Sequence, residues 1–357
     1  MELKDRINAF VQLGDFLRTG ALEQPPAGAL GEKFDERFRE TIKACFSHNG
    51  WFTEENVRLA LVSLADMLLK QKIEKWVSMY PALHQPSTIN HQPSTIGVIM
   101  AGNIPVVGFH DFICVLMSGN KFLGKLSSDD KLLMPLIADV LVTIEPRFKE
   151  CISFTEGKLE GMHAVIATGS NNSARYFEHY FSKFPHVIRK NRSSVAVLNG
   201  TETEEELSGL GRDIFDHYGL GCRSVSKLFL PAGYEHSKFF NAVFRFGSVM
   251  ENNKYANNYE YNRTIYLMNG EKFLDNNFLI LREDISLHSP VGVLLYEYYS
   301  SEERLRERLR MDAANIQCIV SKMDLPGAIP FGTTQCPMLW DYADGVDTMK
   351  FLLTLKS

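Results

Sequence analysis

Cys222 is the residue in this sequence whose surroundings best fit a chemical role. It lies in the run GLGCRSVSKLFLP, between a predicted helix and a predicted strand, with Gly219 and Gly221 removing side-chain bulk beside the sulfur. A nucleophilic cysteine needs a cation, a helix end or backbone N–H groups to favour its thiolate, and Arg223 and Lys227 are near in sequence. The structural alternative is a buried cysteine at a tight turn. The context makes Cys222 a candidate nucleophile.

Three further segments place polar groups directly after predicted strands. The turn AGNIPVVGFHD contains Gly102 and Asn103, and the Asn103 amide could either donate to an oxyanion or cap the following helix. Lys125, in GKLSSDD, could reach a ribose or a phosphate, or remain solvated. In TGSNNSARYF, Gly169 and Ser170 open a helix whose N–H groups suit a phosphate, although serine is also an ordinary helix cap. These segments are candidate cofactor contacts.

Charge and composition exclude several classes of protein. The 357 residues carry a formal charge of −5, so there is no basic surplus with which to bind nucleic acid. No apolar run approaches the roughly 20 residues of a membrane helix. The six cysteines are scattered singly, without a CxxC pair or a nearby histidine at metal-ligand spacing. We therefore expect a soluble, cytoplasmic protein with no membrane span, no nucleic-acid partner and no metal site.

Local patterns divide the chain into four parts. Residues 1–94 are expected to form a helical region and a linker that contains the tandem copy HQPSTIN-HQPSTIG, which we interpret as a local duplication. Residues 95–200 alternate β-branched runs with helical patterns, which indicates βαβ units and a parallel sheet. A second alternating region spans 201–325. The tail, 326–357, is rich in Pro, Gly and aromatic residues and is expected to return to the core or to reach a partner subunit.

The predicted strands fall into two groups, one in each alternating region. The second region begins with a helix in which Thr203 and Glu206 have capping-box spacing and Gly219 can act as the stop. The strands that we predict are 95–101, 121–127, 163–169 and 194–200 in the first region, and 227–231, 278–283, 291–297 and 316–322 in the second.

In this order and spacing, the segments resemble the aldehyde dehydrogenase superfamily, and most closely its acyl-CoA reductase branch, which includes the fatty-acid reductase of bacterial luminescence. The resemblance covers residues 95–357 and implies two parallel-sheet α/β domains, one for the cofactor and one for the catalytic cysteine. It implies that Cys222 is the nucleophile. It also implies that Asn103, in an Asn-x-Pro turn, donates its amide to the oxyanion.

The resemblance also supplies the cofactor contacts, for which NADPH is expected and NADH is possible. The strand-end lysine at the ribose falls on Lys125, and the Gly-Ser at the pyrophosphate falls on Gly169 and Ser170. The full set of residues expected at the cofactor is Gly102, Lys125, Ser127, Ser128, Thr168, Gly169 and Ser170.

Two departures from the family pattern refine the expected activity. Aldehyde oxidisers carry a general-base glutamate ahead of the cysteine, whereas the comparable stretch here, IRKNRSSVAVL (188–198), has no carboxylate. An enzyme without that base should reduce or transfer an acyl group better than it hydrolyses it. Ser128 stands where NAD-preferring relatives have a glutamate, which favours NADPH.

The sequence thus predicts an NAD(P)H-dependent reductase of acyl-CoA, or of an acylated carrier or partner protein, that works through a thioester on Cys222 and could form a homo-oligomer. Two alternatives are a cysteine acyltransferase or thioesterase without a cofactor, and a non-catalytic subunit of an acyl-processing complex. The ending LWDYADGVDTMKFL resembles the tail of acyl-CoA reductases and separates that branch from ordinary aldehyde dehydrogenases.

Overall fold

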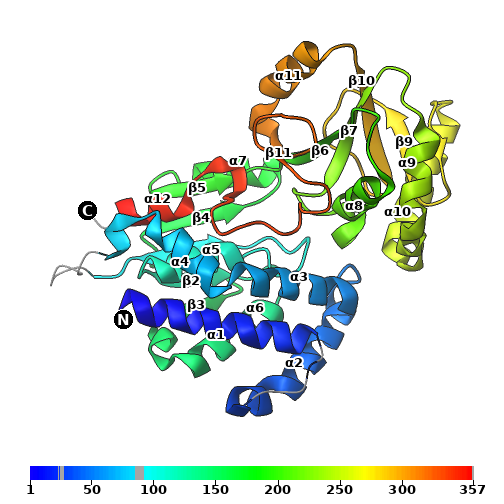
Figure 1. The fold of residues 1–357 in the computed structure, drawn as a ribbon. Coiled ribbons are helices and arrows are strands. Elements are labelled where there is room, and N and C mark those ends of the chain that lie inside the picture. The colour runs from blue at the N-terminus through cyan, green and yellow to red at the C-terminus, as the bar shows by residue number, and fades with distance from the viewer. Residues whose placement is uncertain (23, 25–27, 85–91, 356–357) are drawn as a thin grey trace. The chain divides into compact units, whose positions relative to one another are not determined.

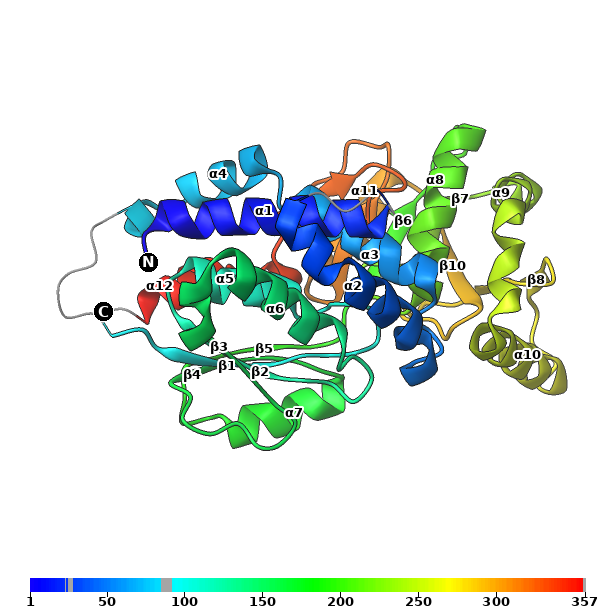
Figure 2. The same ribbon diagram turned by 90° about the horizontal axis from the view of Figure 1, so that it is seen from below.

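A computed structural model describes residues 1–22, 24, 28–84 and 92–355. Residues 85–91 of the tandem copy lie outside the described residues, and its last three residues, 95–97, begin the first strand of unit 1. Two compact units make up the chain: unit 1 comprises Met1–Lys190 and Cys336–Ser357, and unit 2 comprises Asn191–Gln335. Figures 1 and 2 show the elements of each unit. The chain therefore leaves unit 1 once, builds unit 2, and returns.

Unit 1 contains a parallel five-stranded sheet in the order β3-β2-β1-β4-β5. Its strands are β1 (Thr95–Ile99), β2 (Lys121–Lys125), β3 (Ile152–Thr155), β4 (Ala164–Thr168) and β5 (His186–Arg189). Its helices are α1 (Leu3–Ala21), α2 (Gly28–His48), α3 (Glu54–Met67), α4 (Lys70–Ser78), α5 (Phe109–Met117), α6 (Leu133–Ile144), α7 (Asn171–Tyr180) and α12 (Thr348–Thr354).

Both faces of this sheet are covered, as a parallel sheet requires. Ile96 and Val98 of β1 face the large core beneath α5 and α6, whereas Val165 and Ala167 of β4 face a smaller core with Phe181 after α7. Figure 2 shows α1, α5 and α6 on one side of the sheet and α7 on the other. The alternation follows from the two-residue period of a strand.

The expected N-terminal region is part of unit 1. Buried side chains of α1–α4 join the same core as β1 and α5. Arg6 of α1 donates a hydrogen bond of 2.5 Å to the carbonyl of Met117, which is the last residue of α5. The helices of residues 1–84 therefore cover one face of the sheet.

Unit 2 contains a seven-stranded sheet in the order β12-β11-β6-β7-β10-β9-β8, parallel except for β8 against β9. Its strands are β6 (Ser193–Val197), β7 (Val225–Pro231), β8 (Leu274–Asp275), β9 (Ile280–Glu283), β10 (Val293–Tyr299), β11 (Ile316–Val320) and β12 (Ala328–Ile329). Its helices are α8 (Glu204–Phe215), α9 (His236–Val243), α10 (Asn253–Met268) and α11 (Glu302–Met311).

The predicted boundary between the two alternating regions, after residue 200, differs by about ten residues from the boundary between the units, which follows Lys190. The run 194–200 was expected to complete the cofactor domain, but β6 pairs with β7 and β11 of the second sheet. The edge strands β3 and β5 of the first sheet were not predicted. Both are only four residues long, so each gives a weak periodic signal.

The helix that opens unit 2 begins as predicted and ends earlier than predicted. The capping box is confirmed, because the Glu206 amide donates to the Thr203 hydroxyl and the Thr203 amide donates to the Glu206 carboxylate. However, α8 ends at Phe215, and the tight turn that follows it contains the left-handed residues His217, Tyr218 and Gly219.

The tail beyond Cys336 returns to unit 1, one of the two destinations that we expected. Its Leu339, Met349 and Leu352 are buried in the large core of unit 1. The Tyr342 hydroxyl accepts a hydrogen bond of 2.7 Å from the indole of Trp76. The tail is thus a structural part of unit 1.

A buried ion pair joins the end of β5 to α5 and to the tail. Arg189 donates two hydrogen bonds to the Asp111 carboxylate, at 2.6 and 2.8 Å, and one of 2.7 Å to the Thr348 hydroxyl. Both side chains of the pair are only 6% exposed. Desolvation opposes the charge on Arg189, but Asp111 more than compensates and the pKa of Arg189 is raised.

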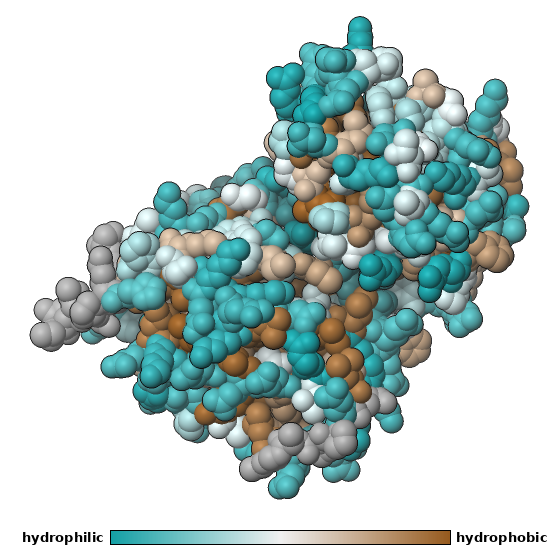
Figure 3. Space-filling model, viewed as in Figure 1, coloured by the Kyte–Doolittle hydropathy of each residue, from teal (hydrophilic) through white to brown (hydrophobic). Residues whose placement is uncertain are grey.

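In the described part of the chain, no helix has both the length and the apolar composition needed to cross a bilayer. On the face shown in Figure 3, hydrophilic residues separate the hydrophobic ones into patches.

Removal of the Arg189 guanidinium should strongly destabilise unit 1. We expect Arg189→Ala to lower the free energy of unfolding by about 3–5 kcal/mol, because it leaves the Asp111 carboxylate buried without its counter-charge. The matched control is the exposed neighbour Lys190→Ala, whose ion pair with Glu178 lies at the surface and which should change the free energy by less than about 1 kcal/mol. Urea titration measures both, and equal effects would contradict the assignment.

Candidate functional site

The carboxyl ends of three adjacent parallel strands bring the expected cofactor residues together. Lys125 at the end of β2 and Ala167 near the end of β4 are both register partners of Ile99 in β1. The chain builds β2 and β3 on one side of β1 and then β4 and β5 on the other, so a topological switch point lies between β1 and β4. Open α/β sheets bind ligands at such a point.

Each predicted cofactor residue lies at this edge. Gly102 follows β1, and its backbone comes so close to Ser127 that an added Cβ would lie 2.5 Å from the Ser127 Oγ. Ser128 is exposed and Lys125 is half-buried. The structure thus gathers these four residues from β1 and β2 at one place.

The β4 side of the edge supplies the start of a helix. Thr168 ends β4, Gly169 follows it, and Ser170 is the N-cap of α7. The Ser170 hydroxyl accepts a hydrogen bond of 3.2 Å from the Ser173 amide. The first N–H groups of a helix carry partial positive charge and suit a phosphate. A helix start at the same sheet edge as Lys125 could hold the phosphates of a dinucleotide. The assignment of Lys125 to a ribose and of residues 168–170 to the pyrophosphate stays a prediction.

Asn103 lies in a strained turn that is held from two sides. Asn103 itself is exposed. Val106 has a φ of 55°, a left-handed conformation that is costly for a β-branched residue. The backbone amide of Val106 donates a hydrogen bond of 2.8 Å to the Asp130 carboxylate. The side-chain amide of Asn49 donates one of 3.4 Å to the Gly102 carbonyl. These bonds fix the turn that presents Asn103.

Cys222 lies in unit 2, in the loop between α8 and β7, and is exposed. His217, Tyr218 and Gly219 all have positive φ, so the first part of this loop contains three consecutive left-handed residues ahead of the cysteine. The Cys222 carbonyl accepts a hydrogen bond of 2.9 Å from the Ser194 hydroxyl at the start of β6. The sulfur is therefore accessible, and the backbone that carries it is held.

The two cations near Cys222 in sequence have partners elsewhere in unit 2. Arg223 donates to the carbonyl of Thr334. Lys227 is fully buried, with its ammonium 3.3 Å from the Glu297 carboxylate and bonded to the Asp284 carbonyl. Burial lowers the pKa of Lys227, and Glu297 partly opposes this shift. Lys227 therefore has a structural role, whereas Arg223 remains beside the cysteine.

Comparisons with known proteins identify the fold. Neither family models nor curated proteins give a match. Among solved structures, an NAD+ complex of an aldehyde dehydrogenase from Bacillus cereus has a TM-score of 0.61 at 13% identity, covering 91% of this chain and 73% of that one. An oxidoreductase from Marinobacter aquaeolei has a TM-score of 0.64 at 11% identity, covering 94% and 84%. This chain has the aldehyde dehydrogenase fold. The expected fold class is confirmed.

A third structure, an NAD-dependent aldehyde dehydrogenase from Sinorhizobium meliloti, gives the same result, with a TM-score of 0.62 at 10% identity over 91% of this chain and 71% of that one. At such identities the likeness concerns the fold. The roles of Cys222, Asn103 and the cofactor residues stay predictions, as does the acyl-CoA reductase branch.

The sequence did not reveal the residues that support the backbone of the candidate site within this aldehyde dehydrogenase fold. Asp130 and Asn49 support the Asn103 turn, but Asn49 ends a helix far upstream. Only the spacing of Asp130 from the predicted strand could have suggested it. His110 and Asp111, the last two residues of the run AGNIPVVGFHD, lie at the start of α5 and bond to Leu339 and Arg189.

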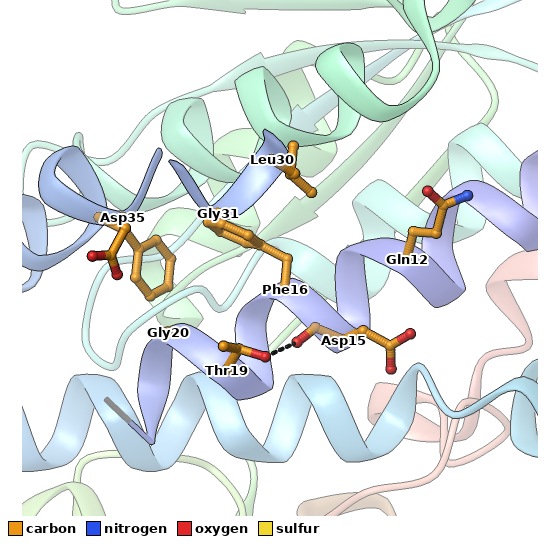
Figure 4. Close-up of a pocket in the computed structure, with 9 residues that line it drawn as sticks. Gln12, Asp15, Phe16, Thr19, Gly20, Leu30, Gly31 and Asp35 are labelled. Carbon is orange, nitrogen blue, oxygen red and sulfur yellow. Dashed lines mark hydrogen bonds between the residues drawn. The ribbon is translucent and has the colours of Figure 1, made fainter. Parts of the chain in front are cut away.

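A hollow between α1 and α2 lies apart from these residues (Figure 4). Its lining includes Phe16, Leu30 and Phe38 with Asp15 and Asp35 at the polar positions. None of the predicted site residues lines it, so we assign it no role in the chemistry.

Asp130 should make stability depend on pH. Burial raises the pKa of its carboxyl to about 6, above the value of about 3.9 of an unfolded chain. The folded state therefore binds the proton more tightly, and the stability from this group falls as the pH rises from about 4 to about 6, by about 3 kcal/mol. We expect Asp130→Asn to lack this loss in urea titrations at pH 4 and pH 7. The exposed neighbour Asp129→Asn should behave as the wild type; if Asp130→Asn does too, the assignment is wrong.

Proposed function

We propose that this chain is an NAD(P)H-dependent reductase that converts an activated acyl thioester, foremost an acyl-CoA, to an aldehyde through an S-acyl intermediate on Cys222. The observation that carries the proposal is the accessible thiol of Cys222 beside β6. The Ser194 hydroxyl of that strand bonds to the Cys222 carbonyl, and residues 188–198 contain no carboxylate. The stretch where aldehyde oxidisers hold their base thus contacts the cysteine loop without supplying one.

The first half-reaction forms the intermediate. The Cys222 thiolate attacks the thioester carbonyl, the new C–S bond forms, and CoA leaves as its thiolate. We propose that the exposed Asn103 amide donates to the carbonyl oxygen as negative charge develops there, which is the kind of contact that lowers such barriers. The turn that holds Asn103 is rigid because Asp130 and Asn49 bond to its backbone.

The second half-reaction is reductive. A bound reduced nicotinamide would supply a hydride to the thioester carbon. Lys125, Ser127 and Gly102 at the ends of β2 and β1, with residues 168–170 at the start of α7, would bind and orient that cofactor. The hemithioacetal on Cys222 then collapses, the C–S bond breaks, and the aldehyde and the thiolate are released. Without a carboxylate in residues 188–198, water is poorly activated and hydrolysis is slow.

Replacement of the sulfur tests the covalent step. We expect Cys222→Ala to lose acyl-CoA reduction by at least about 10³-fold and to lose hydroxylamine-sensitive labelling by radioactive acyl-CoA, while NADPH affinity measured by fluorescence titration is retained. The matched control is Cys336→Ala, another exposed cysteine, which should keep the label.

Each alternative gives a different result in these assays. A cofactor-independent acyltransferase or thioesterase would be labelled but would not bind NADPH. A non-catalytic subunit would not be labelled. Full reduction by Cys222→Ala would refute the proposal.

Cofactor preference should follow the residue at position 128. We expect Ser128→Glu to shift the kcat/KM ratio for NADPH over NADH toward NADH by about 10–100-fold, because a carboxylate there would bond to ribose hydroxyls and repel a 2′-phosphate. Ser128→Gln has a similar size without the charge and should shift the ratio much less. Steady-state kinetics with both cofactors measure it, and equal shifts in the two variants would count against this role.

A further inference from the structure

The carboxylate of Asp213 holds a chain segment far from it in sequence. Asp213 belongs to α8 and is 1% exposed. It accepts a hydrogen bond of 2.6 Å from the amide of Gly332 and one of 3.0 Å from the amide of Thr334. Burial raises the pKa of Asp213, and the two amides partly oppose this shift. A buried carboxylate is tolerated here because both of its oxygens have donors.

The segment that Asp213 holds, residues 332–335, in turn holds the loop of the cysteine. The Thr334 carbonyl accepts a hydrogen bond from the Arg223 guanidinium. The side-chain amide of Gln335 donates a hydrogen bond of 3.2 Å to the Ser224 hydroxyl. The two residues that directly follow Cys222 are therefore both bonded to a segment that Asp213 fixes.

The loop needs such support, because the residues that lead into it have strained backbone conformations. His217 and Tyr218 have φ values of 54° and 57°, which side-chain-bearing residues adopt only when the surroundings impose them. The Ser224 amide closes the loop by donating 2.9 Å to the Gly221 carbonyl. On the other side, Gly332 has a φ of 77°, which glycine adopts without strain.

We propose that Asp213 is a positioning residue for Cys222: it fixes residues 332–335, which bond to Arg223 and Ser224 and so set the direction of the thiol. The catalytic consequence rests on the proposed function, whereas the mechanical coupling does not. Asp213 does not touch the substrate. It acts on the cysteine loop indirectly, through the hydrogen bond of the Thr334 carbonyl with the Arg223 guanidinium and that of the Gln335 side chain with Ser224.

The mechanical coupling is tested by hydrogen exchange on the full chain. Asp213→Asn keeps the side-chain size but replaces one accepting oxygen with a donor. We expect the Ser224 amide, which lies outside the direct contacts of Asp213, to exchange at least about tenfold faster than in the wild type. The matched control is Glu204→Gln, an exposed carboxylate of the same helix, which should leave this exchange unchanged.

The catalytic consequence is tested by the rate of Cys222 acylation by acyl-CoA. We expect Asp213→Asn to lower this rate about 10–100-fold, as a displacement of about 1 Å can do, with the NADPH dissociation constant within twofold of the wild type. Ser224→Ala, which removes only the acceptor of Gln335, should shift the rate in the same direction by less. It also serves as the test if Asp213→Asn does not fold.

The outcomes separate this proposal from the proposed function. Faster exchange at Gly332 and Thr334 with unchanged exchange at Ser224 would overturn the coupling. An acylation rate within twofold of the wild type in Asp213→Asn would overturn the positioning role. If wild-type Cys222 is not acylated at all, the proposed function fails, and exchange at Ser224 still decides whether Asp213 fixes the loop.

Discussion

The parallel pairing of β1 with β2 on one side and β4 on the other is the constraint on which the candidate cofactor edge depends. Parallel strands end at the same edge, so three turns that lie far apart in sequence meet there without any direct preference for one another. The strand order reverses between the neighbouring strands β1 and β4, and α7 begins after β4 at this edge. Polar groups gather at this edge because of topology, and their chemistry follows from their types.

Unit 2 positions its candidate nucleophile at the opposite end of its strands. Cys222 precedes β7, so it lies at the amino end of that strand. Because β6 and β7 are parallel, the start of β6 lies at the same edge, with Ser194 in register with Val225. The cysteine loop is held there by hydrogen bonds to the Ser194 hydroxyl of β6 and to the returning segment near Thr334. A strained backbone that makes several hydrogen bonds can fix the position of a reactive group better than a relaxed loop can.

The sequence was most informative where periodicity is strong. Predicted strands at 95–101, 121–127 and 163–169 correspond to β1, β2 and β4, since their apolar residues face buried cores on both sides. The capping box at Thr203 was also visible, because its two partners are three residues apart. The family likeness correctly indicated the aldehyde dehydrogenase fold.

Long-range contacts could not be predicted in the same way. Asp213 and Thr334 are joined across more than a hundred residues, and nothing local in either segment indicates the other. The placement of β6 in the second sheet depends on its pairing with β11, which no single strand pattern reveals. Left-handed residues such as Val106 cannot be recognised in the sequence, because tertiary contacts impose their conformation.

The return of the chain to unit 1 has a consequence for synthesis. Leu339, Met349 and Leu352 fill part of the core of unit 1, and Thr348 bonds to Arg189. A nascent chain therefore cannot finish unit 1 when its first 190 residues leave the ribosome, although unit 2 is contiguous and can close first. Until the tail arrives, Arg189 lacks its hydrogen bond to Thr348 and the core of unit 1 lacks the three tail side chains, so apolar surface of residues 1–190 stays exposed during synthesis.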